Sequence, residues 1–111
     1  MQIIYENNRV RKQCESLKEA KKFFPVKIAE KLHQTVNFIK EAANLTAIMN
    51  YKPYRFHDLK GDKEGVYSID IGSIRDGYRM ELSFKETKDE VFHNSIEILE
   101  VVVMKVGKHY E

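Results

Sequence analysis

Two runs of alternating apolar and polar residues, joined by an Asp-Gly pair, constrain the fold of this chain more than any other feature. The runs cover residues 66–71 and 78–84, and Asp76 and Gly77 stand between them. Alternation with a period of two is typical of strands with one buried face, and Asp-Gly is a frequent hairpin turn. The segment therefore predicts a β-hairpin that buries its apolar face against other elements.

Two further strands are predicted, one near each end of the chain. Residues 2–5 form a short run of β-branched and aromatic residues that stops at a Glu-Asn-Asn turn signal. Residues 95–106 are nearly continuous in Ile, Leu and Val, which is expected of a central strand buried on both faces. The segments 45–63 and 85–94 show no such pattern and are expected to be connections.

Two amphipathic helices are predicted between the first strand and the hairpin. Apolar residues of the first recur at spacings of three, four and seven, with lysines and arginines between them. They are Val10, Cys14, Leu17 and Phe24. Pro25 suits the first turn of the second helix, which is expected to reach a C-cap at Asn44. The prediction is an α+β fold of order β-α-α-β-β-β, with both helices on one face of a small antiparallel-dominated sheet.

The composition fits one globular domain, residues 1–111, with 42% hydrophobic and 32% charged positions. The single cysteine, Cys14, excludes an internal disulfide and a multi-cysteine zinc cage. It lies on the apolar stripe of the first helix, so we expect a buried hydrophobe there and no reactive thiolate. The sequence has no glycine-rich phosphate loop and no His-Glu pair at helical metal spacing, so we expect neither a cofactor nor a metal site.

No membrane or secretory segment is visible in the sequence. Residues 1–6 lack a basic region followed by an apolar stretch, and the longest uncharged apolar run, 101–104, is far too short to cross a bilayer. We therefore expect a cytoplasmic protein that has no membrane partner.

The net charge of +2 is small, but its distribution is uneven. Residues 1–31 carry eight basic and four acidic side chains, whereas residues 32–111 carry eleven and thirteen. A polyanion would therefore have to bind to local basic patches, because the overall field of the protein is weak.

The most specific sequence pattern begins in the expected connection and runs into the hairpin. Residues 55–69 read Arg-Phe-His-Asp-Leu-Lys-Gly-Asp-Lys-Glu-Gly-Val-Tyr-Ser-Ile, and Gly-Tyr-Arg-Met follows at 77–80 and Val-Gly-Lys-His-Tyr at 106–110. The pattern resembles toxins of the RelE/ParE superfamily. It is most similar to the HigB branch, whose members carry a His-x-Leu-Lys-Gly-Asp-x-x-Gly-x-Trp/Tyr-Ser-Ile block.

The resemblance implies a RelE-like microbial ribonuclease fold and the toxin of a type II toxin-antitoxin system. Such a toxin is a ribosome-dependent mRNA endonuclease, or mRNA interferase, that inhibits translation. The implied partners are the ribosome, mRNA and a cognate helix-turn-helix antitoxin of the HigA type that neutralises the toxin. The toxin-antitoxin complex is expected to bind operator DNA through the antitoxin.

The resemblance also assigns roles to individual residues. Arg79 matches a catalytic arginine, His57 an acid-base histidine and Lys60 a lysine that contacts phosphate. His109 and Tyr110 are candidates for proton transfer and base stacking, although HigB proteins often end in Asp-Tyr-His and RelE has Gly-Lys-Arg at this point. Alternatively, the loop residues are merely solvated and the last residues form a frayed terminus.

The same residue types suit RNA cleavage without a metal. Attack by the 2′-OH needs a proton acceptor, stabilisation of charge on phosphorus and a proton donor for the 5′-oxygen. A guanidinium fits the second role because it stays charged and binds phosphate oxygens through a planar fork. The alternative for Arg79 is a strand residue paired with Glu81 or Asp70. RelE's paired lysines fall at Ser68 and Asp70, so that part of its mechanism does not carry over.

Further basic side chains near these positions are candidates for gripping RNA phosphates. They are Lys52, Arg55, Lys63, Arg75, Lys105 and Lys108. Scattered lysines are also common on any soluble domain, and a solvated surface is the alternative for all of them.

Two other functions fit the same pattern. A ParE-type toxin would inhibit DNA gyrase without cutting RNA, because a shared fold does not fix function. A catalytically degenerate toxin would only bind its partner, and the missing RelE lysines keep this alternative open.

Overall fold

Helices dominate the first half of the chain and strands the second. The computed structural model describes residues 1–108, except for the side chain of Asp62. The first half contains β1 (Gln2–Tyr5), α1 (Asn8–Glu15), α2 (Leu17–Phe23), α3 (Val26–Glu41) and α4 (Leu45–Asn50). The second half contains β2 (His57–Asp58), β3 (Tyr67–Ile71), β4 (Tyr78–Ser83), α5 (Lys88–His93) and β5 (Glu100–Lys108).

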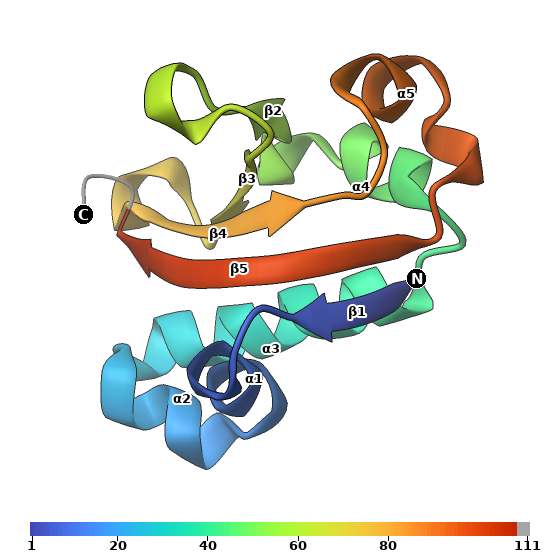
Figure 1. The fold of residues 1–111 in the computed structure, drawn as a ribbon. Helices are drawn as coiled ribbons and strands as arrows, with labels where there is room; N and C mark the ends of the chain where they lie inside the picture. The colour runs from blue at the N-terminus through green and yellow to red at the C-terminus, as the bar shows by residue number, and fades with distance from the viewer. Residues whose placement is uncertain (109–111) are drawn as a thin grey trace.

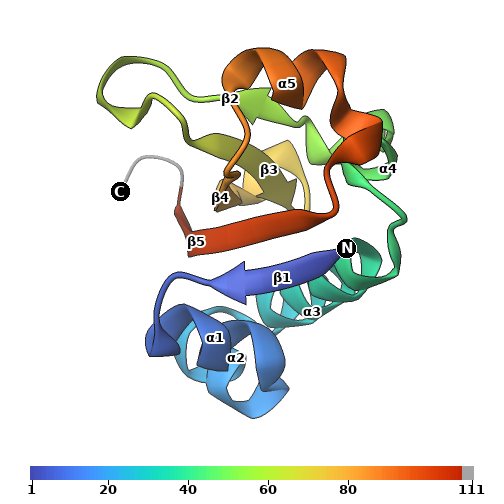
Figure 2. The same ribbon diagram turned by 45° about the vertical axis from the view of Figure 1, so that its right-hand side comes forward.

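The strands form one mixed, mostly antiparallel sheet of five strands in the order β1-β5-β4-β3-β2. Only the β1–β5 pair is parallel among the described strands. Figures 1 and 2 show α1, α2 and α3 on the β1 side of the sheet and α5 next to β2. The predicted α+β class and the β3–β4 hairpin are confirmed, with Ile69 opposite Met80.

The core lies between α3 and one face of the sheet. Helix α3 buries the predicted apolar stripe of Ile28, Leu32, Val36 and Ile39, each 3% exposed or less. The sheet contributes fully buried residues at alternate positions, namely Ile69, Ile71, Met80, Leu82, Val101 and Val103. Burial of each large aliphatic side chain stabilises the fold by about 1.5–3 kcal/mol.

Cys14 is part of this core, as predicted. It is 2% exposed, and burial raises the pKa of its thiol to about 12. The thiol is therefore protonated at neutral pH, which fits a packing role.

The single first helix that the sequence predicts is in fact two. Ser16 ends α1, and its side-chain oxygen accepts a hydrogen bond from the backbone N–H of Glu19 at 3.2 Å, which caps α2. Serine competes for backbone groups in this way and so interrupts a continuous apolar period. Pro25 precedes α3 as its N-cap. The predicted C-cap at Asn44 is wrong, because α3 ends at Glu41 and Asn44 is the N-cap of α4.

Both predicted connections also contain helices. The segment 45–63 includes α4, and the segment 85–94 includes α5, which Thr87 and Glu90 hold in place through reciprocal capping hydrogen bonds. Helices of six residues are too short to show a period, so only their caps mark them in the sequence. The sequence predicts the last strand over residues 95–106, and β5 in fact runs over 100–108. The short strand β2 has no counterpart in the prediction.

Among residues 1–108, no helix is both long enough and apolar enough to span a lipid bilayer.

Candidate functional site

The sheet face opposite α3 carries a compact group of polar side chains. On β3, Ser68 and Asp70 alternate with core residues, and on β4, Arg79 and Glu81 do the same. Antiparallel pairing places Asp70 opposite Arg79 and Ser68 opposite Glu81. Because directly opposed side chains on a sheet lie close together, these four residues form one patch.

Arg79 is held inside this patch by an ion pair. Its side chain is only 13% exposed, and its Nη2 donates to Glu81 Oε2 at 3.0 Å. Lys63 reaches the same carboxylate, with its Nζ 3.3 Å from Glu81 Oε1. The pairing of Arg79 with Glu81 is therefore present, and Lys63 joins it to make a half-buried group of three charges. Arg79 is not a solvated strand residue.

Arg55 extends the patch from the segment that precedes β2. Its backbone has φ of 46° and ψ of 50°, in the left-handed region that non-glycine residues occupy at a cost of about 1–2 kcal/mol. The guanidinium Nε donates to Asp70 Oδ2 at 2.6 Å, and this hydrogen bond raises the pKa of Arg55. The ion pair thus helps to fix a strained turn immediately before His57.

The same turn orients His57. The ring Nδ1 lies 2.6 Å from the carbonyl oxygen of Arg55. Because a carbonyl only accepts, Nδ1 carries the proton, and the neutral ring has its lone pair on Nε2. The neutral form of this exposed ring can therefore accept a proton through Nε2.

Arg79 and His57 line one small hollow of about 150 Å³, which we call the sheet-face pocket. Its other lining residues are Arg55, Ser68, Asp70, Ile74, Gly77 and Tyr78. Pockets that bind whole small molecules usually have volumes of at least roughly 300 Å³, so this smaller pocket suits a single phosphate-sized group.

Two buried polar atoms in the residues that line the pocket are unsatisfied. Arg79 Nε and Ser68 Oγ have no hydrogen-bond partner among the described residues. Buried polar atoms of this kind usually have a partner, so the two unsatisfied atoms mark this patch as unusual among the described residues. The three cations of the network, on Arg55, Lys63 and Arg79, face two carboxylates, so the patch has a positive surplus.

Lys60 is not brought into the sheet-face pocket. It is exposed and lines a separate hollow with Asp58 and Lys88, whose carboxylate oxygen and Nζ lie 2.9 Å apart. The hydrogen bond from Lys88 lowers the pKa of Asp58. The lysine that shares a carboxylate with Arg79 is therefore Lys63, through Glu81, and not Lys60, which the motif indicates.

The remaining sequence candidates are spread around the pocket. Lys52 and Arg75 are exposed on 3-10 turns on either side of β3 in the sequence. Lys105 lies on β5 opposite Glu81, and the Nζ of Lys108 lies 5.2 Å from the centre of the Tyr78 ring. His109 and Tyr110 lie outside the described residues.

Within residues 1–108, no three His, Cys, Asp or Glu side chains are arranged as metal ligands. Sequence reasoning missed that Arg55 and Lys63 bind the two buried carboxylates. The signal was available for the carboxylates themselves, because Asp70 and Glu81 stand at the polar positions of alternating strands.

Comparison of the sequence with protein-family models gives no match, and comparison with curated proteins gives none either.

Proposed function

We propose that this protein is the toxin of a type II toxin-antitoxin system with a RelE-like microbial ribonuclease fold, closest to the HigB branch. It cleaves mRNA on the ribosome without a metal, and a helix-turn-helix antitoxin neutralises it. The supporting observation is the meeting of Arg79 and His57 in one phosphate-sized pocket. These two residues come from the separate blocks on which the sequence resemblance rests.

The roles follow from the geometry of the two side chains. His57 Nε2 accepts the proton of the 2′-OH, and the 2′-oxygen attacks the adjacent phosphorus. Arg79 stabilises the negative charge that develops on the phosphate oxygens through its permanently charged guanidinium, which lines the pocket. The P–O5′ bond breaks, which leaves a 2′,3′-cyclic phosphate on one fragment, and the departing 5′-oxygen takes up a proton.

The ribosome dependence is supported by the modest charge of the site. Asp70 and Glu81 neutralise much of the positive charge of the patch, so the pocket would bind free RNA weakly. A ribosome that presents mRNA in a fixed conformation supplies the orientation that the protein lacks.

A second candidate, a toxin-like module that binds without cleaving, is favoured by one observation. The Arg79 guanidinium is already paired with Glu81 at 3.0 Å, and Lys60 stands in a different hollow. An arginine that serves only to neutralise Glu81 would have the same environment.

The test is cleavage of mRNA on programmed ribosomes by the intact protein and its Arg79→Ala variant. We expect the variant to lose about 100- to 1,000-fold in cleavage rate. Arg79→Lys should recover only part of this rate, because lysine keeps the charge but lacks the planar fork. Arg11→Ala, which removes an exposed cation on α1, is the matched control.

Three outcomes contradict the proposal. Full cleavage by a folded Arg79→Ala protein removes the assigned role of the arginine. Equal cleavage of ribosome-free RNA removes the ribosome dependence. Loss of gyrase supercoiling activity with intact mRNA favours the ParE-type inhibitor.

A further inference from the structure

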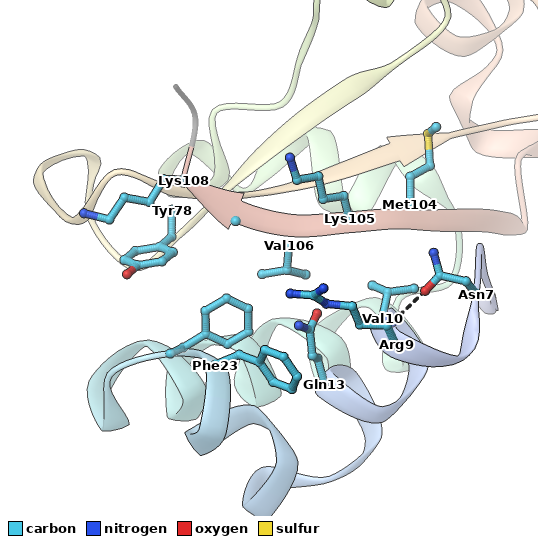
Figure 3. Close-up of a pocket in the computed structure, with 12 residues that line it drawn as sticks. Asn7, Arg9, Val10, Gln13, Phe23, Tyr78, Met104, Lys105, Val106 and Lys108 are labelled. Atoms are coloured by element: carbon cyan, nitrogen blue, oxygen red, sulfur yellow. Dashed lines mark hydrogen bonds between the residues drawn. The ribbon is translucent and has the colours of Figure 1, made fainter. Parts of the chain in front are cut away.

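A long groove runs along the edge of β5 and has no part in the proposed chemistry. Its volume is about 710 Å³, and we call it the edge groove. Figure 3 shows its walls, which come from β5, α1 and the end of α2. The lining residues are Asn7, Arg9, Val10, Gln13, Phe23, Phe24, Tyr78 and the five residues 104–108.

The groove lies where β5 loses its neighbour. Strand β1 ends at Tyr5, which pairs with Val103, so residues 104–108 have a strand on the β4 side only among the described residues. All five of these consecutive residues line the groove. The β4–β5 register shifts at Met104, so Met104 and Lys105 share one side of the strand and Val106 lies on the other. A groove lined from both sides of β5 runs along its open backbone edge.

The side chains above and below this edge differ in character. Figure 3 shows Val106 pointing toward the helices, where it faces Val10 and Phe23, and Met104 and Lys105 pointing to the other side of β5. The groove is therefore apolar on its helical side, apart from Arg9 and Gln13, and carries a cation on the other side.

The charged lining residues all carry the same sign. Arg9, Lys105 and Lys108 line the groove, and no aspartate or glutamate among residues 1–108 does. The guanidinium of Arg9 lies 4.9 Å from the centre of the Phe23 ring, and Phe23 is 46% exposed. An open strand edge beside exposed aromatic and basic groups is a surface that soluble proteins usually cover.

We propose that the edge groove binds an extended acidic segment of a partner protein, which adds to the sheet as a strand beside residues 104–108. Backbone hydrogen bonds to β5 fix the register of the segment. Its side chains alternate, so apolar residues enter between Val10, Phe23 and Val106 while acidic residues face Lys105. An acidic residue near one end of the segment meets Arg9.

Two other occupants fit the groove less well. A second copy of this chain would bring identical basic walls together, because a two-fold contact repeats the same surface on both sides. Single-stranded RNA would use the cations and rings, but it has no row of amides to match the edge of a strand. The inference holds whether or not the protein cleaves RNA, since no residue of the edge groove except Tyr78 lines the sheet-face pocket.

The test uses a seven-residue peptide of alternating glutamate and valine, blocked at both ends, and the full chain. We expect saturable binding in a titration and slower hydrogen exchange at those amides of residues 104–107 that point away from β4. Methylation of alternate peptide nitrogens should weaken binding about 10-fold, because the backbone hydrogen bonds are lost. Exchange of the glutamates for lysines should weaken it at least 10-fold.

Variants of the protein locate the site. Arg9→Glu should weaken peptide binding about 10-fold, whereas Arg11→Glu, a matched change on the same helix outside the groove, should leave it unchanged. Both positions are exposed, so both variants should fold, as circular dichroism will show.

Four results would overturn the proposal. They are no binding of the acidic peptide, equal binding of the N-methylated peptide, tighter Arg9-dependent binding of a six-nucleotide uridine RNA, and self-association of the protein that Arg9→Glu abolishes.

Discussion

The sheet-face pocket and the edge groove share Tyr78 but hold their charges in different ways. In the polar patch around the pocket, both carboxylates are less than a tenth exposed, and each is bound by a cation, Asp70 by Arg55 and Glu81 by Arg79. In the groove, the cations lie over aromatic rings or point outward, and no carboxylate in the described part of the chain lines the walls.

This difference separates two kinds of binding surface. The pocket is a network whose charges depend on one another, so a change to one member disturbs the fold as well as the site. The exposed groove cations Arg9 and Lys105 make separate contacts, so each can change with little effect on stability. Four measurements test this difference between the two regions.

The largest effect is expected at Glu81. Glu81→Ala leaves Arg79 and Lys63 without their shared carboxylate, and we expect the free energy of unfolding to fall by about 2–3 kcal/mol. The loss is below that of a fully buried pair because Lys63 is 43% exposed. Urea unfolding measures it, and Glu81→Gln, which keeps an acceptor for Arg79, should recover part of the loss. A Glu81→Ala variant as stable as the native protein would mean that Glu81, Arg79 and Lys63 do not depend on one another.

A smaller loss is expected at Gly72, in the turn that joins β3 to β4. Its φ is +77°, and a Cβ at this position would stand 2.6 Å from Asp76 Oδ2. We expect Gly72→Ala to lower the free energy of unfolding by about 1–2 kcal/mol. Gly65→Ala is the control, because Gly65 has a φ of +83° but nothing within 4 Å of an added Cβ. Equal losses in the two variants would exclude a contribution from the contact with Asp76.

Arg9 should matter little to the fold. Arg9→Ala removes an exposed contact with the Phe23 ring, which is worth about 0.5–1 kcal/mol at most. Thermal and urea unfolding should therefore be almost unchanged. A loss as large as that of Glu81→Ala would show that the groove is also a coupled network and would remove the contrast between the two regions.

The smallest effect concerns acid stability at Asp76. Hydrogen bonds from the backbone and hydroxyl of Ser73, and then from Lys27, hold the pKa of this carboxyl below its usual range. A lowered folded-state pKa stabilises the protein above the unfolded pKa of about 3.9, and the contribution is lost as the pH falls through the folded value. Asp76→Asn should therefore be less stable than the native chain at pH 7 and match it near pH 2. A gap in urea midpoint that is constant over this range would contradict the pKa shift.

The sequence was a good guide to the sheet and to the core of α3. Alternation predicted β3 and β4, and the spacing of Ile28, Leu32, Val36 and Ile39 predicted the buried stripe of α3. Both signals arise from burial on one face, which repeats over many residues. The short helices α4 and α5 were not predicted, because six residues contain fewer than two turns and show no helical period.

The candidate site was predicted only in part. The motif indicated Arg79 and His57, which share the sheet-face pocket. It gave no sign that Arg55 adopts a left-handed backbone or that Lys63 reaches Glu81, because both depend on how the segment 52–66 folds back over the sheet. The open edge of β5 was also invisible, since it depends on how far β1 extends along its partner.

The burial of Cys14 makes this protein its own reporter of local opening. The chain has one cysteine, and its thiol is 2% exposed on the helix that also forms a wall of the edge groove. An added disulfide reagent can react only when α1 separates from the core, so the labelling rate measures how often that separation happens. A segment bound between α1 and β5 would slow the labelling, and the native chain therefore allows occupancy of the groove to be followed without any engineered probe.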